Sequence, residues 1–305
     1  MSLRELLRSP PPATAWVLDS DTAAVVYRDG KGGLHCASEP VPAGVFEIGP
    51  VGLQGVDSTA LDPLLARLRG AAEGSQTAAV VTPTAWFRCY LIEADRLPRQ
   101  QKELNDVVRW RLKKLLPIPP ADLRLSVTRL PERDGRRQVL CLVGIERALT
   151  ALEASVRAVG VEPGLITTRL LALAARRSRD DIPVLVIQQE PTFLSLVLLA
   201  DGSPRLLRTK PLAVGGPAQP AAIREVGLTL NFIREDLRME GDIEVQLAVE
   251  NEGVESDLRR WLAERPGLVP GAEPATPLCA PNAVAVRVGA ARLMPAVAVV
   301  AGGAR

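Results

Sequence analysis

The chain has 305 residues, enough for two domains or one large bilobal unit, and 47% of them are apolar, enough for sizeable cores. The formal net charge of +2 does not favour a nucleic-acid-binding protein. Residues 1–12 lack the apolar stretch of a secretory signal, and no run approaches the roughly 18 apolar residues that a membrane span requires. We therefore expect a soluble, cytoplasmic protein.

The opening residues have the pattern of an α/β domain. Strands are expected at residues 16–19, 23–28, 34–38 and 78–82. A hairpin turn over residues 29–33 joins two of them, and the last is apolar throughout, as strands covered on both faces are. A helix is predicted over residues 58–71, with Ser58 as its N-cap. Its buried face is expected to carry Leu61, Leu64, Leu65 and Leu68.

Pro83 begins a different pattern. Strands are predicted at residues 86–92, 123–130 and 138–143, and helices at 99–116 and 146–158. The first of these helices has one apolar stripe, formed by Leu104, Val107, Val108, Leu112 and Leu115. Prolines at 117, 119 and 120 stop it. We interpret residues 85–160 as a small α+β unit inserted into the first domain, to which a helix over 167–177 returns the chain.

The second half repeats the opening order of hairpin strands, helix and strand. After a linker at residues 178–183, strands are predicted at 184–187, 193–199, 205–211 and 244–249, and helices at 221–239 and 255–265. A duplication of this kind indicates two related α/β lobes that face each other across a cleft. The expected boundaries are residues 1–84 and 161–180 for lobe one, 85–160 for the inserted unit and 181–305 for lobe two.

Turns between these strands resemble loops that cradle nucleotide phosphates, but three of the four such turns lack the expected glycines. A phosphate cradle needs backbone N–H groups in tight turns and no competing negative charge. Here the turns carry Asp21, Glu190 and Glu250, each of which would repel a triphosphate.

Other catalytic arrangements are missing from the sequence. There is no G-x-S-x-G elbow, H-E-x-x-H helix or P-loop, and the single histidine, His35, follows a Gly-Gly turn without a catalytic partner. The four cysteines form no C-x-x-C pair, so we expect neither zinc nor a disulfide framework. They are Cys36, Cys89, Cys141 and Cys279.

Residues 107–119 read Val-Val-Arg-Trp-Arg-Leu-Lys-Lys-Leu-Leu-Pro-Ile-Pro. This segment resembles a helix of the PilM family of type IV pilus assembly proteins, which has a central Arg-Trp, two lysines and a Pro-x-Pro stop. Weaker similarities lie in residues 80–83, 212–216 and 296–305. The resemblance, shared more distantly with FtsA, covers nearly the whole chain. It implies a bilobal actin-like fold, that is, a duplicated ribonuclease H-like α/β fold with a small α+β subdomain in lobe one.

The chain departs from that family at its nucleotide loops. The first loop keeps Asp19 but has Asp21 where the family has glycine and Val26 where it has lysine. The second loop has Gln188 and Glu190 in place of Asp-x-Gly. The third has Glu250 within a run that is normally glycine, and only Gly215 and Gly216 keep the family pattern. We therefore expect no bound cofactor, with Mg-ATP as an unfavoured possibility, and no catalytic residues.

The resemblance implies a cytoplasmic scaffold that binds the N-terminal peptide of a PilN-like inner-membrane protein and so meets the pilus assembly platform and its motor ATPases. An extended peptide can pair with a sheet edge while side-chain pockets select its sequence. The residues expected to bind it are Trp86, Arg88, Tyr90, Trp110, Arg111 and Lys114. The structural alternative for Trp110 is packing within the inserted unit.

Two other functions stay open. One is an actin-like ATPase that holds Mg-ATP through altered contacts. The other is the cytoplasmic piece of a type II secretion platform, similar to GspL. The family also allows a homo-oligomer. Neither nucleic acid nor a membrane span of its own is expected, so the chain would lie at the inner membrane only through its partners.

Overall fold

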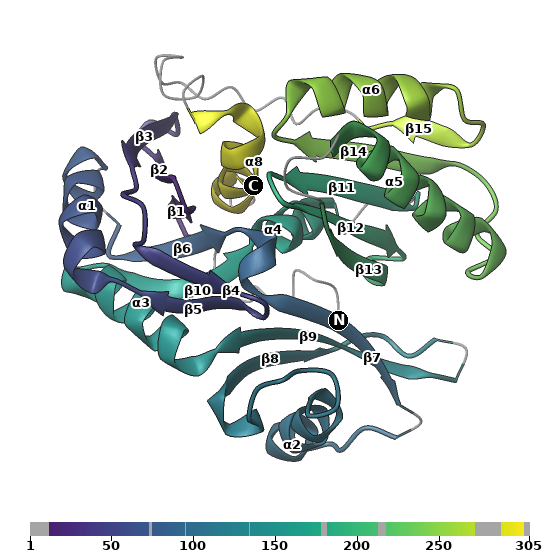
Figure 1. Ribbon diagram of the computed structural model, residues 1–305, viewed down its shortest axis with the longest axis horizontal. Helices are drawn as coiled ribbons and strands as arrows, with labels where there is room; N and C mark the ends of the chain where they lie inside the picture. The colour runs from purple at the N-terminus through teal and green to yellow at the C-terminus, as the bar shows by residue number, and fades with distance from the viewer. Residues whose placement is uncertain are drawn as a thin grey trace.

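The computed structural model describes residues 12–72, 75–94, 96–133, 135–177, 182–212, 218–271 and 288–301. It has two α/β lobes, with a smaller sheet-and-helix unit below lobe one (Figure 1). This arrangement is the bilobal α/β fold that the sequence predicts. Residues 178–181 of the linker predicted at 178–183, the Gly215-Gly216 pair, Cys279 and residues 302–305 lie outside the described residues.

Lobe one is built on a five-stranded sheet in the order β10-β6-β1-β2-β3. Its strands are β1 (Thr14–Leu18), β2 (Thr22–Arg28), β3 (Leu34–Pro40), β6 (Thr77–Thr82) and β10 (Glu162–Thr168). The first three are antiparallel, whereas β6 and β10 run parallel to β1. A separate hairpin joins β4 (Phe46–Gly49) to β5 (Gly52–Val56). Helices α1 (Ser58–Ala71) and α3 (Glu146–Ala158) pack on one face of the sheet.

Lobe two repeats this topology strand for strand. Its sheet has the order β13-β12-β11-β14-β15, with the same antiparallel hairpins followed by two parallel strands. The strands are β11 (Val184–Glu190), β12 (Phe193–Ala200), β13 (Ser203–Pro211), β14 (Ile243–Val249) and β15 (Leu268–Pro270). Helices α5 (Ala218–Glu235) and α6 (Glu252–Ala263) cover its outer face. The duplication inferred from the sequence is therefore present in the fold.

The last helix of each lobe crosses to the other lobe. Helix α4 (Arg169–Arg177) follows the lobe-one strand β10 but packs on the inner face of the lobe-two sheet. Helix α8 (Ala290–Ala301) ends the described chain and packs on the inner face of the lobe-one sheet, although the sequence boundaries assign it to lobe two. The two helices pack against each other between the sheets (Figure 1).

The inserted unit has a three-stranded antiparallel sheet in the order β7-β9-β8. Its elements are the 3-10 turns η2 (Thr84–Trp86) and η3 (Pro120–Asp122), helix α2 (Gln101–Leu112), and strands β7 (Arg88–Ala94), β8 (Leu123–Arg129) and β9 (Arg137–Ile145). One face of the sheet packs against α2. The other face packs against α4 and the strands of lobe two. Helix α3 lies within the range predicted for the inserted unit, residues 85–160. Its apolar face is nevertheless buried in the core of lobe one.

Several predicted details change for local reasons. The N-cap of α1 is Asp57, whose carboxylate accepts from the N–H groups of Thr59 and Ala60, rather than Ser58. Trp86 lies in η2, so the strand predicted from 86 starts at Arg88. Leu115 lies beyond the end of α2 and is exposed, so it leaves the predicted apolar stripe.

The β4–β5 hairpin packs tightly against η2 through Gly52. This glycine has a φ of +115°, and a Cβ placed there would lie 2.2 Å from the carbonyl oxygen of Trp86. Position 52 requires a positive φ and leaves no room for a Cβ. Only glycine meets both conditions, because other residues are strained at positive φ and any side chain would collide with the backbone.

We expect Gly52→Ala to lower the free energy of unfolding, measured by urea denaturation, by about 1–3 kcal/mol or more, because it adds a backbone collision to the cost of positive φ. Gly44→Ala is the matched control, since Gly44 also has positive φ (+88°) but nothing within 4 Å of its Cβ position. Equal losses in the two variants would contradict the close packing of the hairpin.

Candidate functional site: a buried charge cluster between the lobes

The carboxylates predicted at the nucleotide loops meet at a buried arginine. Arg169 is the first residue of α4, and its side chain is only 1% exposed. Its Nη2 lies 2.5 Å from Asp19 Oδ2, which follows β1 in lobe one. Its Nη1 lies 2.6 Å from Glu250 Oε1 and 3.7 Å from Glu190 Oε1, both in lobe two. One guanidinium therefore joins loops of the two lobes.

A second arginine holds the outer side of the cluster. Arg292 lies in α8, and its Nη1 donates to Asp21 Oδ1 at 2.6 Å. Its Nε donates to Glu250 Oε2 at 2.6 Å and lies 3.8 Å from Asp19 Oδ2. Arg169 directly follows β10, whereas Arg292 lies in α8, later in the chain than β15, and both cations contact Asp19 and Glu250.

Glu190 is held at the base of the cluster by uncharged groups as well. Its Oε1 accepts from the Thr84 N–H at 2.8 Å, and its Oε2 accepts from the Ala85 N–H at 3.3 Å. Thr84 Oγ1 donates to Gln188 Oε1 at 2.7 Å. These bonds link the start of the inserted unit to lobe two.

Burial sets the protonation of the cluster. It raises the pKa of Glu190 to about 7, against the opposing charge of Arg169. Partial burial also raises the pKa of Asp21, but the hydrogen bond and charge of Arg292 outweigh it and hold that pKa below its ordinary value. Burial lowers the pKa of Arg169, and the carboxylates of Asp19, Glu190 and Glu250 more than offset it, so the guanidinium stays charged.

The net charge of this site is unsuited to a polyphosphate. Two guanidinium groups face four carboxylates, which leaves a formal charge of −2, or −1 when Glu190 is protonated. Like charges at about 4 Å repel by roughly 1 kcal/mol in water and several times more at a protein-like dielectric. Both guanidinium groups already form ion pairs with the protein's own carboxylates.

The other candidate groups from the sequence are the possible metal ligands, the histidine and the cysteines of the described residues. No group of three His, Cys, Asp or Glu side chains among them is placed to hold a metal ion. His35 lies on β3, where its Nε2 is 2.8 Å from Asp29 Oδ2 and its ring stacks on Tyr27. Cys36, Cys89 and Cys141 are free thiols. Within the described part of the chain, none of the helices combines the length and apolar composition of a membrane span.

Sequence reasoning identified the acidic half of this cluster and missed the basic half. Asp19, Asp21, Glu190 and Glu250 lie in the cluster and Gln188 lies beside it, whereas Gly215 and Gly216 fall outside the described residues. The two arginines carry no local motif.

The six residues predicted to bind a partner do not form one surface. Trp86 is buried at 3% exposure against Phe46 in the core of lobe one. Tyr90 packs with the core under α2. Arg88 donates to the carbonyl oxygens of Ala85, Phe87 and Pro50, which ties it to the β4–β5 turn.

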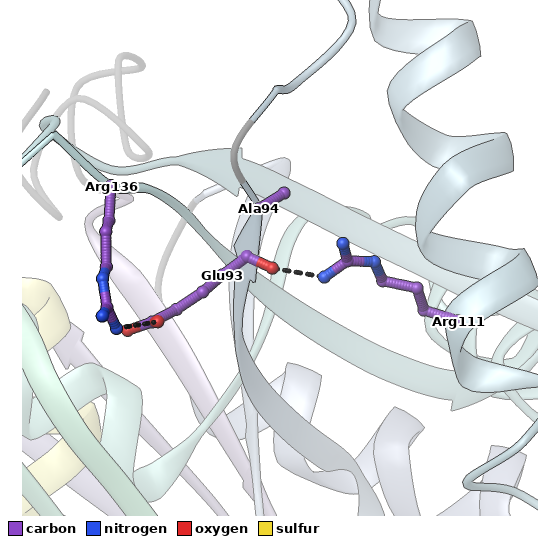
Figure 2. A pocket seen from close by; sticks show the side chains of 4 residues that line it. All are labelled: Glu93, Ala94, Arg111 and Arg136. Carbon is purple, nitrogen blue, oxygen red and sulfur yellow. Dashed lines mark hydrogen bonds and ion pairs between the residues drawn. The ribbon is translucent and has the colours of Figure 1, made fainter.

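The remaining three lie on or next to α2, on different sides. Trp110 is 64% exposed, and the Lys114 amine lies 5.3 Å from its ring centroid. Arg111 points instead toward the end of β7 and donates to the Glu93 carbonyl oxygen, beside the Glu93–Arg136 ion pair (Figure 2). Glu93, Ala94, Arg111 and Arg136 line a small cavity of about 210 Å³.

A larger cavity of about 560 Å³ lies between lobe one and the inserted unit. Its walls come from the β4–β5 hairpin, the proline-rich loop after α2 and the start of α3. The lining residues are Pro50, Val51, Gln54, Pro117, Ile118, Ala121, Asp122, Ile145, Glu146 and Arg147. Val51 and Ile118 also pack against both neighbouring cores, so the cavity sits at the junction of the two units.

The sequence matches no protein-family model and no curated protein. Solved structures do match the fold. One described as the PilM–PilN type IV pilus biogenesis complex has a TM-score of 0.69 and 18% identity, over 96% of this chain and 98% of its own. A Bacteroides thetaiotaomicron protein with an actin-like ATPase fold and unknown function has a TM-score of 0.50 and 9% identity, over 87% and 92%. The chain therefore has the bilobal actin-like fold.

The cytoplasmic domain of EpsL, an inner-membrane component of the type II secretion system of Vibrio cholerae, is also similar. Its TM-score is 0.46 with 11% identity, over 83% of this chain and 94% of its own. At that level the similarity adds no argument about function.

We expect Arg169→Met to lower the free energy of unfolding at neutral pH by about 3–5 kcal/mol, because it leaves buried carboxylates without their cation. Urea denaturation followed by circular dichroism measures the change. Arg124→Met is the matched control: Arg124 also faces two carboxylates, Glu146 and Glu153, but its side chain is 31% exposed. That variant should lose about 1 kcal/mol or less. Equal losses would show that Arg169 is not the centre of the cluster.

Glu190→Gln tests the protonation of the cluster. Because the folded pKa of Glu190 is raised above its ordinary 4.5 to about 7, its contribution to stability is full below pH 4.5 and falls as the pH rises to 7. The unfolding free energy of the native protein minus that of the variant should therefore fall by roughly 3 kcal/mol between pH 4.5 and 7. A difference that rises with pH would mean that Arg169 keeps Glu190 ionised instead.

Proposed function

We propose that this protein is a scaffold of a type IV pilus or related secretion assembly platform, held closed without nucleotide. The observation that carries the proposal is the buried charge cluster between the lobes. Arg169 and Arg292 neutralise the loop carboxylates and tie lobe one to lobe two through the protein's own side chains. A nucleotide would have to displace these contacts and face the remaining negative charge. ATP hydrolysis is accordingly not part of the proposed role.

The similarity to the PilM–PilN complex over nearly the whole chain supports a role in pilus assembly. The proposed partner is the N-terminal cytoplasmic peptide of a PilN-like inner-membrane protein. The chain would then act in the cytoplasm, at the inner membrane through that partner.

The cavity between lobe one and the inserted unit is the proposed peptide site. Its volume suits a few side chains, and its lining is apolar apart from Gln54, Asp122, Glu146 and Arg147. Of the six residues that the sequence predicted for this role, Arg88 contacts the cavity wall, by donating to the Pro50 carbonyl oxygen. Apolar side chains of the peptide would enter between Val51 and Ile118.

A fluorescently labelled peptide from the N-terminus of the PilN-like partner tests the proposal by anisotropy. We expect micromolar binding that Ala121→Trp weakens at least about tenfold by filling the cavity. Ala94→Trp is the matched control, because it adds the same side chain beside Arg111, at the smaller cavity (Figure 2). No binding at high micromolar peptide would sink the proposal. Loss of binding in Ala94→Trp alone would show that the peptide binds at the smaller cavity beside Arg111 instead.

A further inference from the structure

The two most exposed large apolar side chains among the described residues lie five positions apart at the end of α2. Trp110 is 64% exposed and Leu115 is 60% exposed. Helix α2 already buries Leu104, Val108 and Leu112 on the inserted sheet, so neither residue is needed for that core. Scattered apolar residues on a surface are ordinary, but two together in one segment call for a physical reason.

The segment that carries them is positively charged. Residues 107–121 contain four cations and no acidic residue: Arg109, Arg111, Lys113 and Lys114 are the cations. Glu103 and Asp106 lie toward the start of α2, and Asp122 follows the segment. Arg109 and Arg111 donate to the carbonyl oxygens of Leu123 and Glu93, whereas Lys113 and Lys114 are exposed. The helix dipole favours cations at this end but does not explain the exposed Trp and Leu.

We propose that this α2 tip, defined as Trp110, Lys113, Lys114 and Leu115, rests on an anionic membrane surface. Tryptophan prefers the interface between headgroups and hydrocarbon, and leucine adds apolar area that lipid can cover. Each lysine near an anionic bilayer adds attraction that salt screens. Helix α2 lies on the side of the inserted sheet that faces away from both lobes (Figure 1).

The tip leads directly into the larger cavity. Pro117 and Ile118, two and three positions after Leu115, line that cavity. Membrane contact through the tip would therefore hold the mouth of the cavity close to the bilayer. This consequence rests on the proposed function, but the lipid contact itself does not.

The test is flotation of the whole protein with vesicles of phosphatidylcholine alone, or of phosphatidylcholine with about 30% phosphatidylglycerol. We expect binding to the anionic vesicles only, weakened by 0.5 M salt. Trp110→Ser with Leu115→Ser, and separately Lys113→Gln with Lys114→Gln, should each reduce partitioning on the order of tenfold. The matched control is Leu228→Ser with Phe232→Ser, which removes two exposed apolar side chains from α5 without loss of binding.

Failure to float with anionic vesicles would overturn the proposal, and so would undiminished binding in both tip variants. If the tip variants instead lose binding to the PilN-like peptide while the native protein ignores vesicles, the tip is a protein-docking surface and the lipid assignment is wrong. Peptide binding that persists in the tip variants, together with lost vesicle binding, supports the membrane contact. It also separates this result from the test of the proposed function.

Discussion

A guanidinium group in a protein interior must be paired, and this requirement organises the centre of the molecule. Arg169 is almost fully buried at the start of α4, where the two lobes meet. The cost of removing its charge from water is offset only if carboxylates converge on it with good geometry. Asp19 comes from lobe one, and Glu190 and Glu250 come from lobe two. One buried cation therefore joins carboxylates of both lobes, beside Arg292 and the packed helices α4 and α8.

The duplicated topology explains how such a cluster can arise. Each lobe places a hairpin turn and the end of a parallel strand at the same edge of its sheet, and each sends its last helix across to the other lobe. Loops from both halves therefore face one central space. In an actin-like fold these are the turns expected to meet nucleotide phosphates. Here acidic side chains occupy the turns, and the space between them holds Arg169 and Arg292.

Local patterns predicted the fold well and long-range pairing poorly. Helices α1 and α3 have the predicted bounds, because apolar periodicity and clear stop signals define both. The short strands of the β4–β5 hairpin were missed, since their residues alternate weakly around Gly52. Asp19 was noticed as a loop residue, but its partner Arg169 lies 150 residues away, and a sequence alone does not pair charges over that distance.

The residues predicted to bind a partner also depend on long-range packing that the sequence does not reveal. Trp86 and Trp110 have the same residue type, yet one is in the core of lobe one and the other is exposed on α2. Their environments depend on how the inserted unit docks on lobe one, which no local pattern encodes. The cavity at that junction is formed by segments from three separate parts of the chain, so its lining became visible only in the folded structure.

Isothermal titration of the whole protein with Mg-ATP tests the central claim most directly, namely that the lobes are held by internal charge pairs instead of by nucleotide. The account predicts no saturable heat of binding up to about 1 mM nucleotide, where even a Kd of that size would correspond to only about 4 kcal/mol. A saturable isotherm with low-micromolar affinity would contradict it. That result would mean that the Arg169 cluster opens to admit a triphosphate.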